Sequence, residues 1–211
     1  MKDIIIKLIA ASLLTACAFS LVSCTAKKPI APENTEAPAE ESIVFFGDSI
    51  TYLGDWESWF SGHKVTNLGV SGDRIADLID RVDQVTAAKP TKLFVMVGVN
   101  DILTGYDPAD IIAEHEKLLK ELQDKLPGCE IYVESVLPAD RAYPNSDRIL
   151  AYDSELSALA EKLGLEYIDL FPLYRDRSGF LMSQYTGDGL HLLRDAYEQW
   201  VEQIRPLIDN K

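Results

Sequence analysis

The sequence predicts an α/β fold in which a five-stranded parallel sheet carries helices on both faces. Short apolar runs alternate with amphipathic segments five times along the chain, which is the rhythm of βαβ units. The runs are apolar at nearly every position, as expected for strands that are buried on both faces. The first run leads directly into Gly47-Asp48-Ser49, and ligands of open α/β sheets bind just beyond such strand ends.

The predicted strands are short and rich in β-branched and aromatic residues, and they cover residues 43–46, 65–68, 93–97, 131–136 and 167–169. The predicted helices are amphipathic. The first lies near Trp56, and the second covers 75–85 with Asp73 as its N-cap. The third follows the capping pair Asp107-Pro108, and the fourth covers 149–163 and ends before Gly164. The last begins at about Leu192, and Pro206 is expected to kink or end it.

Length and composition favour one globular domain with appendages. The chain has 211 residues, of which 47% are hydrophobic and 26% charged. A chain of this length buries about 70% of its unfolded surface without disulfides or metal. The formal net charge of −14 would repel nucleic acid and anionic lipid. We therefore expect no nucleic-acid partner.

The N-terminus indicates export. Residues 1–23 combine a charged start with an apolar run, as in a secretory signal peptide, and residues 21–24 resemble a bacterial lipobox ending at Cys24. A second match ends at Cys17, and a single membrane-spanning anchor is the structural alternative. We expect a lipid on Cys24, a flexible tether over 24–41, a globular domain over 42–211, and an extracytoplasmic location on a bacterial membrane. Cys129, the remaining cysteine, is interpreted as a small strand residue.

Ser49 is the candidate nucleophile, and only three histidines are available as its base. His63 lies in a turn before the second strand, where it should point away from the carboxyl ends of the strands. His115 falls on the apolar face of a helix and is interpreted as a packed residue. His191 alone sits on a loop with an acid, Asp188, three residues before it, so we expect His191 to take the Ser49 proton and Asp188 to orient the imidazole.

The chain resembles the SGNH hydrolases, also called the GDSL lipase and esterase family, and most closely their acetylhydrolase-like branch. The resemblance covers about residues 42–210 and depends on four blocks in order, which contain Ser49, Gly69, Asn100, and Asp188 with His191. It implies a flavodoxin-like three-layer α/β/α fold with strand order 2-1-3-4-5. It also implies a Ser49-His191-Asp188 triad and an oxyanion hole made by the N–H groups of Ser49 and Gly69 and the Asn100 amide.

The resulting functional prediction is a serine esterase that removes short acyl groups, most plausibly acetyl, from esters of carbohydrates or small molecules. The alternatives are a lysophospholipase or thioesterase of the same family, an acyltransferase, and a carbohydrate-binding module without turnover. Arg141, Tyr143 and Tyr185 lie in loops expected to choose the substrate. Asp48 is expected to brace the loop. No metal or cofactor is implied.

Overall fold

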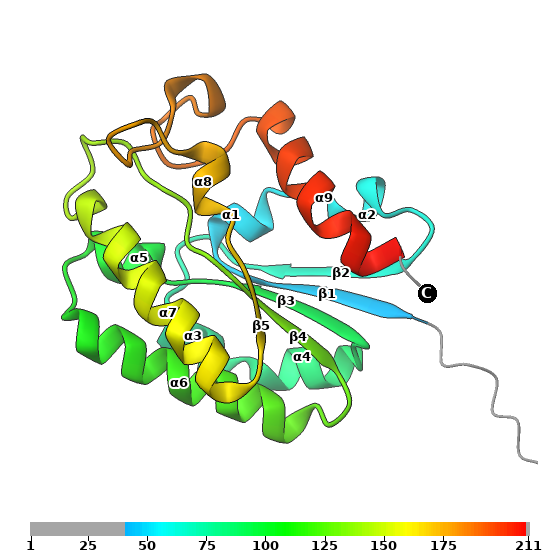
Figure 1. The fold of residues 1–211 in the computed structure, drawn as a ribbon. Helices are drawn as coiled ribbons and strands as arrows, with labels where there is room; N and C mark the ends of the chain where they lie inside the picture. The colour runs from blue at the N-terminus through cyan, green and yellow to red at the C-terminus, as the bar shows by residue number, and fades with distance from the viewer. Residues whose placement is uncertain (1–40, 210–211) are drawn as a thin grey trace, which may run out of the picture. The chain divides into compact units, whose positions relative to one another are not determined.

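Five parallel strands in the order β2-β1-β3-β4-β5 form the sheet of residues 41–209, the part of the chain that the computed structural model describes (Figure 1). The strands are β1 (Ser42–Gly47), β2 (Lys64–Gly69), β3 (Lys92–Met96), β4 (Glu130–Glu134) and β5 (Glu166–Ile168). The predicted α/β fold class and strand order are therefore confirmed. The predicted signal peptide and the tether up to residue 40 lie outside the described residues.

Helices cover both faces of this sheet, which gives three layers (Figure 1). The α-helices are α1 (Ser49–Tyr52), α2 (Trp56–Trp59), α3 (Ile75–Asp80), α4 (Val82–Ala88), α5 (Val99–Leu103), α6 (Pro108–Lys125), α7 (Ile149–Leu163), α8 (Phe171–Tyr174) and α9 (Arg194–Asp209). Two 3-10 turns, Ser146–Arg148 and Ser183–Tyr185, lie in the loops before α7 and before α9. Helices α3, α4, α6 and α7 pack together on one face, whereas α2 and α9 lie on the other.

A row of aromatic rings forms the core beneath α2 and α9. Phe45, Phe94 and Tyr132 are register partners on three neighbouring strands, and their rings stack with centroids 5.1 and 4.7 Å apart. Trp56 of α2 stacks on Phe45 at 4.1 Å, and Trp200 of α9 packs edge-on against Trp56. Such pairs contribute about 0.5–1.5 kcal/mol each beyond their buried area. The aromatic residues of the first predicted helix thus belong to the core.

The segment after β2 differs from its prediction. Asp73 does not cap a helix, and the single helix expected over 75–85 is divided at Arg81 into α3 and α4. The start of α3 is capped by Asp77, which accepts from the Arg74 N–H at 2.9 Å. The Asp73 carboxylate instead receives the Arg81 Nε–H at 2.7 Å. A tertiary ion pair therefore overrides the local capping signal.

The remaining helix predictions hold with small shifts at the ends. Asp107 caps α6 by accepting from the Ala109 N–H at 2.9 Å, and Gly164 ends α7 with φ of 69°. The last helix begins at Arg194 rather than Leu192 and continues through Pro206 to Asp209. None of the described helices is long and apolar enough to cross a membrane.

Candidate active site

The predicted site residues meet at the carboxyl edge of the sheet. Ser49 is the first residue of α1, directly after β1, and Gly69 ends β2. Asn100 lies in the first turn of α5, which follows β3, and the loop before α9 supplies Asp188 and His191. Because parallel strands end at one edge, segments distant in sequence converge there.

A glycine is required at the entrance to this site. A Cβ atom on Gly47 would lie 2.2 Å from both the Met96 carbonyl oxygen and Thr51 Oγ1. No other residue type could let α1 turn back so tightly over the ends of β1 and β3. This close approach places Ser49 at the start of α1, with its side chain largely buried.

Ser49, His191 and Asp188 form one continuous hydrogen-bonded chain. His191 Nε2 lies 2.9 Å from Ser49 Oγ, and His191 Nδ1 lies 2.6 Å from Asp188 Oδ2. A carboxylate can only accept, so the proton of a neutral His191 belongs on Nδ1 and leaves Nε2 free to accept the Ser49 hydroxyl proton. The geometry is that of a nucleophile, a base and an orienting acid.

Asp188 is held in place by its own loop. Its Oδ1 accepts the N–H groups of Leu190 and His191 at 2.9 and 2.8 Å, as well as the Thr186 hydroxyl at 3.2 Å. Burial opposes the charged form, but the hydrogen bonds from the His191 ring and these N–H groups outweigh it and hold the pKa of Asp188 well below its usual range. Asp188 is therefore a permanent carboxylate at any physiological pH.

A second loop braces this one, and sequence reasoning missed it. The Asp140 N–H donates to the Gly189 carbonyl at 2.7 Å, and the Tyr143 hydroxyl donates to the Asp188 carbonyl at 3.3 Å. Tyr143, expected to choose the substrate, thus contacts the backbone of the acid. Arg141 lies over the Phe180 ring at 4.4 Å. The only sequence signal was the polar, proline-containing composition of the loop.

The three predicted oxyanion donors differ in their present partners. Among the described residues, the Ser49 N–H has no acceptor. Asn100 uses one amide hydrogen to donate to the Asp73 carbonyl at 2.8 Å, which leaves the second hydrogen free. The Gly69 N–H, however, donates to Asn67 Oδ1 at 2.9 Å. Two of the three predicted donors are thus free in this conformation.

Asp48 is a buried acid beside the nucleophile. Its Oδ1 accepts the Ile50 N–H at 2.9 Å, which caps α1 as expected of a loop-bracing residue. Its Oδ2 has no partner within the described part of the chain. Burial raises the pKa of Asp48 to about 7, although the Ile50 hydrogen bond and the neighbouring His191 act in the opposite direction. Asp48 therefore changes charge in the neutral pH range.

The other two histidines and Cys129 lie away from the site. His63 contacts Glu41 and Asp209 at the opposite edge of the sheet. His115 is fully buried, its Nδ1 lies 2.6 Å from the Tyr152 hydroxyl, and burial lowers its pKa to about 3, which makes it a neutral packing residue. Burial also raises the pKa of the Cys129 thiol to about 11, so that it stays protonated.

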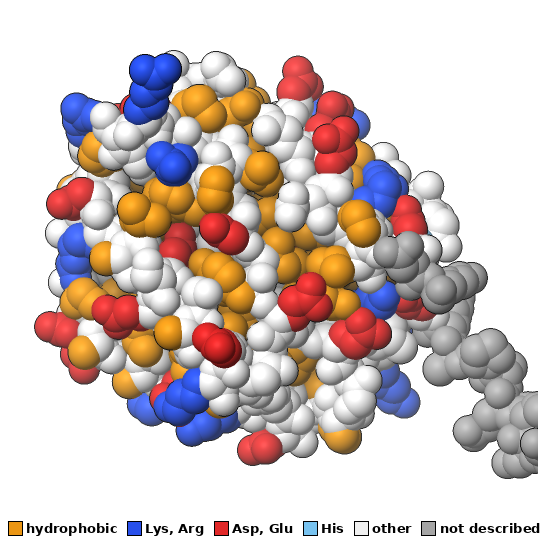
Figure 2. Space-filling view, in the orientation of Figure 1, with side chains coloured by type: hydrophobic (Ala, Val, Ile, Leu, Met, Phe, Trp, Pro, Cys, Tyr) orange, Lys and Arg blue, Asp and Glu red, His pale blue; other side chains and the backbone are white. Residues whose placement is uncertain are grey.

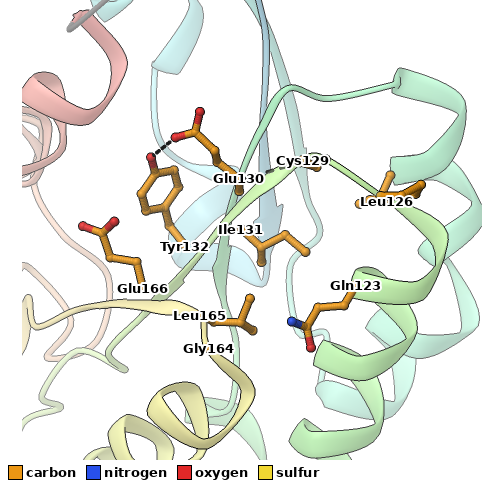
Figure 3. A pocket seen from close by; sticks show the side chains of 11 residues that line it. Gln123, Leu126, Cys129, Glu130, Ile131, Tyr132, Gly164, Leu165 and Glu166 are labelled. Carbon is orange, nitrogen blue, oxygen red and sulfur yellow. Dashed lines mark hydrogen bonds between the residues drawn. The ribbon is translucent and has the colours of Figure 1, made fainter. Parts of the chain in front are cut away.

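One pocket lies away from the candidate site. It has a volume of about 370 Å³ and opens near the amino ends of β4 and β5, beside the C-terminal ends of α6 and α7 (Figure 3). Gln123, Leu126, Cys129, Tyr132 and Glu166 line it, among others, and the Tyr132 hydroxyl donates to Glu130 at 2.6 Å. Within residues 41–209, no group of three or more His, Cys, Asp or Glu side chains is arranged to hold a metal ion.

Several apolar side chains are exposed close in sequence to the site residues. Tyr52 and Leu53 follow Ser49 by one turn, Val70 follows Gly69, and Leu193 lies two residues beyond His191, each 43–56% exposed. On the face seen in Figure 2, apolar side chains lie near the centre with several Asp and Glu side chains among them, and Lys and Arg side chains lie mainly toward the margins.

Comparison with known proteins defines the class of this chain. A GDSL-like lipase from Bacteroides thetaiotaomicron has a TM-score of 0.71 at 20% identity, with 81% of this chain and 88% of that chain covered. An acetyl-xylooligosaccharide esterase from a Geobacillus species has a TM-score of 0.65 at 18% identity, covering 78% and 93%. These similarities show a shared α/β/α fold.

The family follows from the sequence match. The model of the GDSL-like lipase/acylhydrolase family matches residues 45–199. The chain therefore belongs to this family. Among curated proteins, an N-acylneuraminate cytidylyltransferase from Streptococcus agalactiae is 25% identical over 175 residues, which are 80% of this chain and 40% of that protein. The chain thus spans about two fifths of the length of the curated relatives it matches.

Proposed function

We propose that this protein is a serine esterase that removes short acyl groups, acetyl above all, from esters of carbohydrates or small molecules. The observation that carries the proposal is the unbroken chain from Asp188 through His191 to Ser49, with contacts of 2.6 and 2.9 Å. The Asp188 carboxylate is charged and the His191 imidazole presents Nε2 to the Ser49 hydroxyl, as the roles of orienting acid and base require.

The proposed reaction has two steps. Ser49 Oγ attacks the ester carbonyl while His191 Nε2 takes the hydroxyl proton, and His191 then donates that proton to the departing alcohol. A water molecule, deprotonated by His191, next attacks the acyl-enzyme, and the proton returns to Ser49 as the carboxylic acid leaves. Asp188 keeps the imidazole oriented and stabilises its charged form.

The proposed oxyanion hole uses the free donors beside Ser49. The Ser49 N–H and the second amide hydrogen of Asn100 lack acceptors among the described residues, so they are available to the tetrahedral intermediate. The Gly69 N–H joins them only if it exchanges Asn67 Oδ1 for the substrate oxygen. Preorganised donors of this kind are among the largest contributions to catalysis.

The short-acyl assignment is supported by the shape of the chain around the site. The loops at the catalytic edge, residues 137–145 and 171–187, hydrogen-bond to each other and to the segment that carries Asp188, and within residues 41–209 no further insert is present at this edge to build an acyl tunnel. The similarity to an acetyl-xylooligosaccharide esterase supports acetylated sugars as the first substrates to test. O-acetylated neuraminic acids join that panel, because the matched curated relatives are named for N-acylneuraminate.

A second candidate is a lysophospholipase or thioesterase. The observation in its favour is the set of exposed apolar side chains next in sequence to the site residues: Tyr52, Leu53, Val70 and Leu193. Exposed apolar groups at this position could contact a longer acyl chain. The dependence of kcat/KM on acyl length distinguishes the two candidates.

We also propose that the protein is lipid-anchored outside the cytoplasm through Cys24. The support is the apolar N-terminal run and the lipobox-like residues 21–24, all outside the described residues. The test is metabolic labelling with a radioactive fatty acid. The Cys24→Ser variant should lose the label, and the Cys17→Ser variant should keep it; the opposite pattern would move the attachment site to Cys17.

The experiment that tests the esterase proposal uses p-nitrophenyl esters of two to twelve carbons with the purified protein. Hydrolysis of acetate or butyrate is expected in the unsubstituted protein and should fall to background in Ser49→Ala and His191→Ala. Activity that survives in Ser49→Ala would refute the assigned nucleophile. A maximum at eight or more carbons would favour the second candidate.

A further inference from the structure

Arg81 is a largely covered cation whose contacts converge behind the candidate site. Its side chain is 11% exposed and lies in the break between α3 and α4. Its guanidinium lies over the Phe46 ring, 4.5 Å from the centroid, on the face of the sheet opposite to the aromatic row. The predicted helix is divided at Arg81, and the Arg81 side chain turns inward at this break to contact the sheet.

Three hydrogen bonds join this guanidinium to the catalytic edge of the sheet. Nη2 donates to the Gly47 carbonyl at 2.9 Å, and Nη1 donates to the Leu68 carbonyl at 2.6 Å. Nε donates to the Asp73 carboxylate at 2.7 Å. Gly47 precedes Asp48-Ser49, and Leu68 precedes Gly69, so one side chain connects the two strand ends that carry the proposed nucleophile and one proposed oxyanion donor.

The third contact extends to Asn100. The Asp73 backbone carbonyl accepts the Asn100 side-chain amide at 2.8 Å. This bond determines the direction of the second, free amide hydrogen, because the amide is planar. Arg81 holds the side chain of the same residue whose carbonyl orients Asn100. Movement of Asp73 would therefore turn the proposed oxyanion donor.

Only an arginine fits this set of acceptors. The guanidinium offers five N–H donors in a rigid plane, and here three of them reach acceptors on different segments. A lysine ammonium is a single point of charge, so it could keep the pair with Asp73 but could not span both strand ends as well. Arg81→Lys therefore keeps the positive charge beside Asp73 but removes the hydrogen bonds that join the two strand ends.

We propose that Arg81 is a positioning residue for ester hydrolysis, which fixes the ends of β1 and β2 relative to each other and, through Asp73, aims the Asn100 amide. The proposal rests on the proposed serine-esterase function of the same site. It assigns Arg81 no contact with the substrate. Substitution of Arg81 should therefore lower kcat rather than raise KM, and the size of the loss should depend on the presence of the Asn100 amide.

The test is a double-mutant cycle with Arg81→Lys, Asn100→Ala and the combined variant, assayed on p-nitrophenyl acetate. Asn100→Ala alone should lower kcat about 100- to 1,000-fold, as loss of one oxyanion donor does elsewhere. We expect Arg81→Lys to lower kcat about 10- to 100-fold with KM within about twofold. In the Arg81→Lys background, Asn100→Ala should then cost less than about tenfold, because the amide is already misdirected.

Arg205 provides the matched control. It also combines a ring contact, over Phe60 at 5.2 Å, with an ion pair, to Asp209 at 3.6 Å, but on α9 and without bonds to strand ends. Arg205→Lys should leave kcat unchanged. Thermal unfolding of all variants identifies those that fold. If Arg81→Lys does not fold, Arg81→Met takes its place in the same cycle with the same expected non-additivity.

A second readout separates failure of this proposal from failure of the proposed function. Diethyl 4-nitrophenyl phosphate should phosphorylate Ser49, with release of 4-nitrophenolate and transfer of the hydroxyl proton to His191, and mass spectrometry measures the rate. No modification of folded, unsubstituted protein would refute the serine-esterase function and with it the role of Arg81. The other outcome is that Ser49 is modified and the ester is turned over, but the effects of Arg81→Lys and Asn100→Ala on kcat simply multiply. That result would refute the role of Arg81 and leave the serine-esterase function standing.

Discussion

The burial of the Glu134 carboxyl group predicts how the stability of the protein depends on pH. This glutamate ends β4, is 1% exposed, and accepts the Trp200 indole N–H of α9 at 2.6 Å. Burial raises its pKa from 4.5 to about 8, and the Trp200 hydrogen bond opposes only part of that change. Glu134 is therefore protonated in the folded protein at neutral pH, whereas in the unfolded chain it is ionised.

The pH dependence follows from this difference in pKa. A group whose pKa is raised in the folded state contributes its full stability below the unfolded pKa, and that contribution is lost as the pH rises through the folded pKa. Between pH 4.5 and about 8, each pH unit lowers the free energy of unfolding by about 1.4 kcal/mol. The ionisation of Glu134 therefore lowers the free energy of unfolding by at most about 5 kcal/mol by pH 9. The loss begins near pH 4.5 and is nearly complete at pH 9.

Glu134→Gln removes the ionisation and keeps an acceptor for Trp200. The free energy of unfolding of the variant, relative to the unsubstituted protein, should rise by roughly 4 kcal/mol between pH 5 and pH 9. Urea denaturation followed by tryptophan fluorescence at each pH measures it. Esterase activity at pH 7 should be unchanged, since Glu134 has no recorded bond to a proposed site residue within the described part of the chain.

Glu202→Gln is the control, because Glu202 is an exposed glutamate on α9 whose side chain makes no hydrogen bond or ion pair among the described residues. Its stability should follow that of the unsubstituted protein at every pH. The reasoning would be refuted if the advantage of Glu134→Gln stayed constant within about 1 kcal/mol from pH 5 to pH 9, because the burial of the carboxyl group would then carry no ionisation cost.

Three further predictions concern the site and its surroundings. Asp188→Asn should lower kcat by more than about 100-fold while KM changes little, because an amide does not hold the imidazole in the required tautomer; equal kcat values would remove Asp188 from the mechanism. Because the pKa of Asp188 is held well below its usual range, kcat/KM plotted against pH should show no inflection from this group above pH 4. Cys129, whose thiol pKa is about 11, should react with iodoacetamide at pH 8 much more slowly than free cysteine, and equal rates measured by mass spectrometry would contradict its burial.

The sequence by itself determined the fold class and the composition of the candidate site. Apolar runs without alternation indicate buried parallel strands, and their alternation with helices indicates a parallel sheet covered on both faces. The strand order, by contrast, was implied by the resemblance to the SGNH hydrolases. The Gly47-Asp48-Ser49 turn after β1 and the loop with Asp188 and His191 before α9 were both recognisable, because turn chemistry and acid-to-histidine spacing are local properties. The residues meet because parallel strands share one carboxyl edge.

Only the tertiary structure decided which partners these residues take. Asp73 reads locally as a helix cap, yet its carboxylate pairs with Arg81, eight residues away, and the helix divides there. The Gly69 N–H is occupied by Asn67, and Asp48 is buried enough for its pKa to reach about 7. These outcomes depend on competition among partners brought together by packing and on the removal of water, and neither is encoded in the residues near each position along the chain.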